Sequence, residues 1–314
     1  MGKQTPKIEW VDDHDLVNER GQWIDTFRRP YVRLNEPTVE IGFSGAPNLR
    51  IAYPSFEDWV GIYDPRHNSP EATNRQRYLD FRFRHQRGVM SLLNKIAASQ
   101  VGKVVLEEVR LTYQRIRLLP YHAIPAPFWS SSHGAIAQMR VDDLLQFIGD
   151  FENYSGTDTD IFIQPPFTAR GGNGGILVHE LAHAIRNGQG FKDRNIRLNK
   201  RWDNEEEFAA TMVYNTYLSE VEPGFAPVTY DFAELSDPEG FLDLRVSRQF
   251  TARAMLILFR TAQPRFFKGL AGVPTSVAKF NPFRQLAKET VEAELKHNAR
   301  MFTFEMKHPT PNRR

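Results

Sequence analysis

Two histidines and a glutamate are the residues of this chain whose types and spacing could do chemistry together. They lie in the stretch 176–185, which reads Ile-Leu-Val-His-Glu-Leu-Ala-His-Ala-Ile. His179 and His183 are four residues apart, so on a helix both imidazoles lie on one face and can share one metal ion. Glu180 can reach a water on that metal without being a ligand. Zinc lowers the pKa of such a water towards about 7, and Glu180 can take its proton as the water attacks an amide carbonyl.

The residues around this motif favour a metal over a chance match. Every other position from Ile176 to Ile185 is apolar, which predicts a helix that is buried almost all round. Buried histidines need polar partners, and a metal ion would supply them. Because the chain has no cysteine, any metal must be held by histidines and carboxylates. The sequence therefore predicts one Zn²⁺ on His179 and His183, with Glu180 as the general base.

A catalytic zinc usually takes three protein ligands and keeps one open position. The pattern that supplies a third histidine is excluded, because Arg186 stands where it needs glycine and Gln189 where it needs histidine. An acidic cluster, Asp203-Asn204-Glu205-Glu206-Glu207, opens the next predicted helix. The third ligand is expected among these acids, and the others are expected to be solvated first-turn residues favoured by the helix dipole.

The motif followed by this cluster resembles the gluzincin families of zinc metallopeptidases, in which a glutamate on a second helix completes the site. Several of them carry that ligand in a Glu-x-Phe-Ala pattern, which here is Glu206-Glu207-Phe208-Ala209. The resemblance implies Glu206 as the third ligand. Glu207 is the close alternative, and Glu205 and Asp203 follow it.

The polar residues farther along the second helix have plainer interpretations. Tyr214 and Tyr217 are expected to pack in the core with a polar end, although a tyrosine could stabilise an oxyanion. Asn215 could orient a ligand histidine.

The order of elements favours an α+β fold. Strands are predicted early and helices late, with little alternation between them. The predicted strands are 38–43, 49–53, 113–118 and 160–164, and the predicted helices are 87–97, 104–109, 141–148, 205–219, 244–260 and 282–297. With the resemblance, this predicts a zincin-like core, namely a small mixed sheet, an active-site helix and a helical C-terminal half.

The chain divides by composition near residue 85. Residues 1–85 are rich in aromatic residues, proline, asparagine and arginine, and are expected to serve delivery or substrate docking, or to belong to the same domain as the rest. Residues 86–314 are predicted to form the zinc metallopeptidase domain.

Charge and hydropathy limit the partners. A formal net charge of +2 is too small to favour nucleic acid, so the basic stretches 82–87 and 194–201 are interpreted as solvated surface. No apolar run is long enough for a membrane span. The N-terminus is polar and unlike a cleaved signal peptide, so folding in the cytoplasm is expected, with export by a route that does not read such a signal.

Residues 88–222 resemble bacterial effector metallopeptidases, the toxins with this motif that are delivered into other cells. The resemblance implies a protein or peptide substrate in a host or competitor cell, and a cognate inhibitor in the producing cell. The strand at 160–164 is expected at a sheet edge, where an extended substrate could pair with it. The alternatives are another zinc amidohydrolase, acting on a small amide or a cell-wall peptide, and a non-catalytic binding module.

Overall fold

A computed structural model gives the arrangement of the chain. It describes residues 7–17, 23–33, 39–56, 59, 75–120, 135–139, 156–163, 174–190 and 198–290. The helix predicted at 141–148 lies outside the described residues. The description that follows concerns the described ranges.

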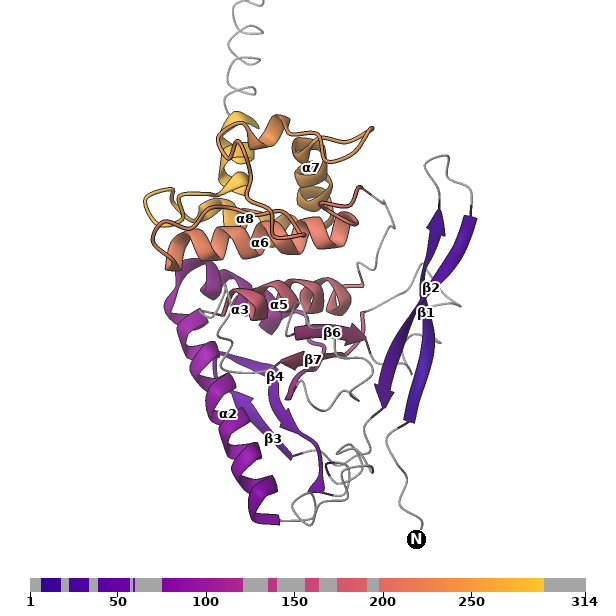
Figure 1. Cartoon of the computed structure of the whole chain (residues 1–314). Helices are drawn as coiled ribbons and strands as arrows, with labels where there is room; N and C mark the ends of the chain where they lie inside the picture. The colour runs from indigo at the N-terminus through magenta and orange to yellow at the C-terminus, as the bar shows by residue number, and fades with distance from the viewer. Residues whose placement is uncertain are drawn as a thin grey trace, which may run out of the picture.

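Five of the described strands form one mixed sheet in the order β3-β4-β5-β7-β6. They are β3 (Val39–Phe43), β4 (Ala46–Tyr53), β5 (Ile116–Pro120), β6 (Ala135–Met139) and β7 (Thr159–Ile163). The three inner strands β4, β5 and β7 are parallel, whereas β3 and β6 run antiparallel to their neighbours. A separate two-stranded sheet of β1 (Lys7–Val17) and β2 (Trp23–Arg33) stands beside the main body in Figure 1.

The predicted strand pair near the N-terminus is confirmed, with a shorter turn than expected. β3 and β4 are antiparallel, and the turn lies at Ser44 and Gly45 rather than over the Gly-Ala-Pro-Asn sequence. Ala46 already pairs with Phe43, so the two residues after it belong to β4.

The expectation that the strand at 160–164 lies at a sheet edge is wrong. β7 pairs with β5 on one side and with β6 on the other. All five of its residues are buried, as is typical of an inner strand of a covered sheet. The edge position belongs to β6, where no strand was predicted.

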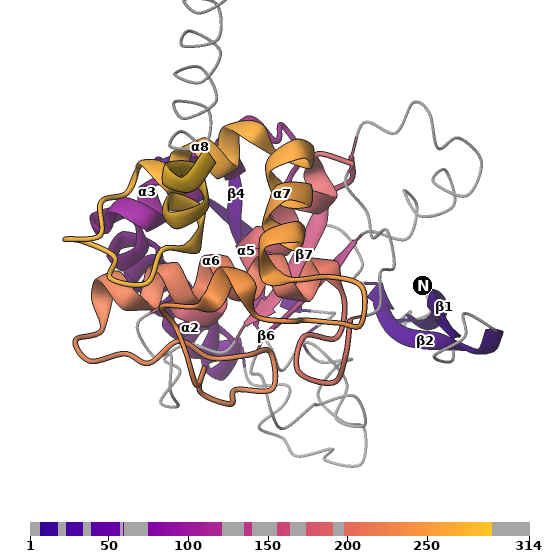
Figure 2. The same ribbon diagram turned by 90° about the horizontal axis from the view of Figure 1, so that it is seen from above.

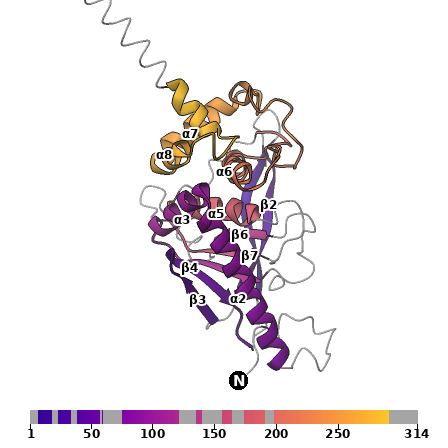
Figure 3. The same cartoon turned by 90° about the vertical axis from the view of Figure 1, so that its left-hand side faces the viewer.

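Helices cover the sheet in two layers (Figures 1 and 3). α2 (Arg75–Ala98), α3 (Gln100–Leu111) and α5 (Gly175–Gly188) lie against the sheet, and α6 (Glu205–Val221), α7 (Ala252–Ala262) and α8 (Pro264–Gly272) lie outside α3 and α5. Figure 2 shows α6, α7 and α8 from above. Residues 282–290 are also helical. The α+β class is therefore confirmed.

α2 begins twelve residues before the helix predicted from Arg87, because its first half is anchored by aromatic rather than aliphatic residues. Tyr78 is buried, contacts Tyr53 and Trp59, and donates a hydrogen bond to the carbonyl of Pro54 over 3.0 Å. The expected division after residue 85 thus falls inside a helix. β3 and β4, before residue 85, pair into the same sheet as β5, after it.

The C-terminal half is helical as predicted, with different boundaries. α7 begins at Ala252 rather than near 244, because the hydroxyl of Thr251 caps its first turn by accepting from the Ala254 amide. α8 was not predicted and begins with Pro264, a favourable first residue of a helix. None of the described helices is long and apolar enough to cross a membrane.

Candidate metal centre

The histidine pair lies on a helix whose start is fixed by a glycine. Gly174 has φ +93° and precedes α5, a backbone conformation that side chains with a Cβ rarely adopt. From there the helix runs through the core, and Leu177, Leu181 and Ile185 are fully buried. The predicted burial of this helix almost all round is confirmed.

His179 and His183 share the face of α5 that packs against the start of α6. Their Nε2 atoms are 3.1 Å apart. Both imidazole side chains are mostly buried, with exposed fractions of 17% and 11%. The predicted convergence of the two imidazoles is therefore present.

Glu207 supplies the third donor atom. Its Oε2 lies 3.1 Å from Nε2 of His179 and 3.2 Å from Nε2 of His183. A tetrahedral zinc with bonds of about 2.0–2.1 Å needs donor atoms about 3.3 Å apart, so these three positions fit one small cation with little movement. Among the described residues, His179, His183 and Glu207 form a group that could hold a metal ion.

The expected ligand Glu206 lies on the other side of the imidazole. Its Oε1 is 3.0 Å from Nδ1 of His183, away from the point where the two Nε2 atoms meet. The face of α6 that carries Glu207 and Tyr214 is turned towards His179, whose ring lies edge-on 6.4 Å from that of Tyr214. The described group that could hold a metal ion therefore contains Glu207, the close alternative, rather than Glu206.

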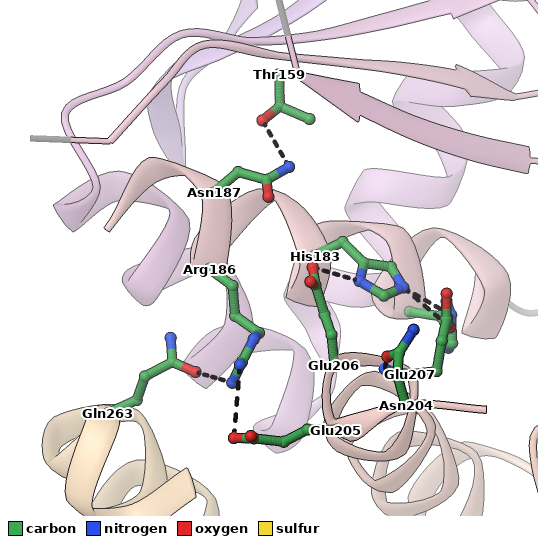
Figure 4. Close-up of polar contacts among 10 residues, drawn as sticks. Thr159, His183, Arg186, Asn187, Asn204, Glu205, Glu206, Glu207 and Gln263 are labelled. Carbon is green, nitrogen blue, oxygen red and sulfur yellow. Dashed lines mark hydrogen bonds and ion pairs between the residues drawn. The ribbon is translucent and has the colours of Figure 1, made fainter. Parts of the chain in front are cut away.

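Glu206 instead determines which ring nitrogen of His183 carries a proton (Figure 4). An ionised carboxylate can only accept hydrogen bonds, so Nδ1 of His183 carries a proton and donates a hydrogen bond to Glu206. In the neutral imidazole this leaves a lone pair on Nε2, which lies near Nε2 of His179 and Oε2 of Glu207. Carboxylates that hold ligand histidines in this way raise their basicity and fix the ring.

Glu205 also turns towards α5, where its Oε1 lies 3.8 Å from Nη2 of Arg186. The expectation that the acids not used as ligands would be solvated is wrong for this turn, because all three glutamate side chains are at most 15% exposed. All three face chargeable groups on α5, because Glu205 faces Arg186 while Glu206 and Glu207 face His183.

The closeness of these chargeable groups shifts the pKa values of His183 and Glu207. Burial disfavours a charged His183, but the charge of Glu207 and the hydrogen bonds with Glu206 and Glu207 outweigh it and raise the pKa of His183 well above 6.5. Burial also opposes ionisation of Glu207, yet the charge of His183 and hydrogen bonds from both histidines lower its pKa well below 4.5. A metal ion would compete with the proton that this arrangement binds.

Glu180 lies on α5 between the two histidines and is buried, with an exposed fraction of 7%. Asn215 does not contact a histidine in the described structure. Its side chain bonds both the amide and the carbonyl of Val228, which fixes the chain after α6. Burial raises the pKa of Tyr217, whose side chain lies in the core.

Asn204 is a site residue that the sequence reasoning did not use, although its type and position are typical of a helix cap. Its side chain accepts from the Glu207 amide over 2.9 Å and so begins α6 at Glu205. The cap fixes the helical phase of the three glutamates.

The comparisons with known proteins leave the site to be judged on its own residues. The chain matched no protein-family model, no curated protein and no solved structure.

Proposed function

We propose that the chain is a zinc-dependent metallopeptidase of gluzincin type, with His179, His183 and Glu207 as metal ligands. The observation that supports this most is the convergence of three donor atoms at separations of 3.1 to 3.2 Å, two of which lie on the helix that also carries Glu180. In this proposal the metal ion takes the place of the proton that His183 holds without it.

Each residue has a separate task in this proposal. When bound, a zinc ion supplies Lewis acidity that polarises an amide carbonyl and acidifies a water molecule. Glu180 takes the proton of the attacking water and returns it to the leaving amine. Glu206 keeps Nδ1 of His183 protonated, so that Nε2 remains free for the metal.

The sheet edge favours a peptide substrate over a small amide. β6 pairs with β7 through one edge, and no described strand pairs with its other edge. It also packs against α5, the helix that carries the histidines. An extended peptide could add to this edge by backbone hydrogen bonds and lie along α5. The expected pairing of substrate with β7 is thus moved to β6.

The proposal includes a biological setting. Residues 88–222 resemble effector metallopeptidases, so we propose a protein substrate in a target cell, export without a cleaved signal, and a cognate inhibitor in the producing cell. The proposed biological setting rests on this resemblance alone, whereas the proposed chemistry rests on the residues of the site.

Metal content and peptide hydrolysis test the site together. Wild type should contain about one zinc per chain, and His179→Ala and Glu207→Ala should lose it. Glu180→Gln should keep the zinc but not cleave a library of extended peptides that wild type cleaves. A wild type that takes up no zinc when it is offered contradicts the proposal. Hydrolysis of small acyl-amides but not of peptides would instead indicate another zinc amidohydrolase.

A further inference from the structure

A third residue of α5 follows the two histidines towards α6. Arg186 is three residues after His183, so it continues the stripe on which both imidazoles lie. The first turn of α6 places three carboxylates along this stripe: Glu207 lies near both Nε2 atoms, Glu206 near Nδ1 of His183, and Glu205 near Arg186 (Figure 4). Three consecutive glutamates of α6 thus lie near residues spaced along one side of α5.

Arg186 is deeply buried but loosely bonded. Its exposed fraction is 4%. Nη2 lies 3.8 Å from Glu205, Nη1 donates to Oε1 of Gln263 over 3.3 Å, and Nε has no hydrogen-bond partner in the described part of the chain. Burying a charge is costly, and the contacts with Glu205 and Gln263 offset part of that cost.

Gln263 connects Arg186 to the outer helices. It lies between α7 and α8, and its Nε2 donates to Oε1 of Gln189 over 2.7 Å. Gln189 in turn follows the end of α5. The guanidinium is therefore held from α6 on one side and from the α7–α8 junction on the other (Figure 4).

We infer that Arg186 is a positioning residue for the metal ligand Glu207, an inference that rests on the proposed function. Successive residues of a helix differ by about 100° in direction, so the rotation of α6 about its axis decides whether Glu206 or Glu207 faces the two Nε2 atoms. Glu205 on Arg186 and Glu206 on Nδ1 of His183 fix two points of this turn. With both held, Glu207 faces both Nε2 atoms.

Positioning and charge compensation predict opposite effects on metal binding. A positive charge near a cation site weakens cation binding, so its removal should tighten zinc binding if charge were its whole contribution. If Arg186 positions Glu207, its removal should weaken zinc binding despite the lost repulsion.

The experiment is zinc affinity by competition with a chromogenic chelator, together with the visible absorption of the cobalt-substituted protein. Arg186→Met should weaken zinc binding about 10–100-fold, as loss of residues that orient ligands typically does. It should also alter the cobalt absorption. Arg186→Lys keeps the charge without the planar fork and should not restore binding. In the Arg186→Met background, Glu205→Gln should have little further effect.

Two controls separate the outcomes. Arg117→Met removes another buried arginine, in the sheet, and should leave zinc affinity unchanged. If Arg186→Met does not fold, Arg186→Lys decides, with about tenfold weaker binding expected. Unchanged or tighter zinc binding in either Arg186 variant overturns the inference while leaving the proposed function intact. A wild type that binds no zinc overturns both.

Discussion

Arg117 and Arg186 are both buried, but the number of acidic groups around them and the distances to those groups differ. In the sheet, Arg117 on β5 forms a two-pronged pair with Asp160 on β7, with both nitrogen–oxygen distances at 2.6 Å. Between α5 and α6, Arg186 lies 3.8 Å from one of three glutamates. The sheet pair balances one charge with one charge, whereas the helix junction keeps an excess of acid. This difference separates an ion pair that supports the fold from a cluster that, in the proposed function, holds a cation.

Glu180→Gln should give the largest effect, on the reaction alone. Loss of a general base typically costs about 10²–10⁴-fold in rate, and the amide cannot take the proton. Zinc content and thermal unfolding should match wild type. Comparison of kcat on a cleaved peptide with zinc content checks this, and full activity in Glu180→Gln would remove Glu180 from the mechanism.

Arg117→Met should destabilise the fold without touching the metal centre. It leaves Asp160 buried without its guanidinium, which typically costs about 3–5 kcal/mol in free energy of unfolding. Urea unfolding measures the loss, and zinc titration of the folded fraction should give the wild-type affinity. A parallel loss of zinc affinity would mean that the sheet pair and the helix junction are coupled.

Glu206→Gln should weaken zinc binding moderately, by about 10–100-fold, because a neutral amide fixes Nδ1 of His183 less firmly than a carboxylate. Glu207→Gln at the neighbouring position should weaken it more, because Glu207 is the ligand in this account. Chelator competition on both variants checks the order, and the reverse order would restore Glu206 as the ligand.

The smallest effect is a pH dependence of the metal-free protein. Because the folded-state pKa of His183 is raised above 6.5, its stabilising contribution is complete below that value and is lost as pH rises through the raised pKa. The lowered pKa values of Glu206 and Glu207 contribute stability above 4.5 that is lost as pH falls through those values.

Thermal unfolding from pH 4 to pH 10, without and with zinc, measures this dependence. The metal-free protein should lose stability on the alkaline side, and zinc should stabilise it increasingly there, because the metal replaces the proton. A metal-free stability that is flat across the alkaline range would show that His183 does not hold the proton.

The sequence predicted those parts of the site that depend on one helix, and missed those that depend on how two helices meet. The spacing of His179 and His183 is a property of α5 alone. The choice between Glu206 and Glu207 is not, because it depends on which face of α6 turns to α5. In the structure this face brings Glu207 to both Nε2 atoms, and no local pattern shows it.

The same distinction applies to the fold. The alternating strand predicted at 38–43 is present as β3 (Val39–Phe43), since it follows from a local pattern. The inner position of β7 and the early start of α2 were not, because they depend on a distant edge strand, β6, and on a cluster around Tyr78 that joins separate parts of the chain.

The central claim is that His179, His183 and Glu207 hold one zinc ion. A crystal structure of the zinc-loaded protein, with anomalous diffraction measured on both sides of the zinc absorption edge, tests it most directly. The account predicts a single strong peak about 2.0–2.2 Å from Nε2 of both histidines and from a carboxylate oxygen of Glu207, with Glu206 still on Nδ1 of His183. A peak bonded to Glu206 instead of Glu207, or no peak between the histidines in zinc-loaded crystals, would contradict it.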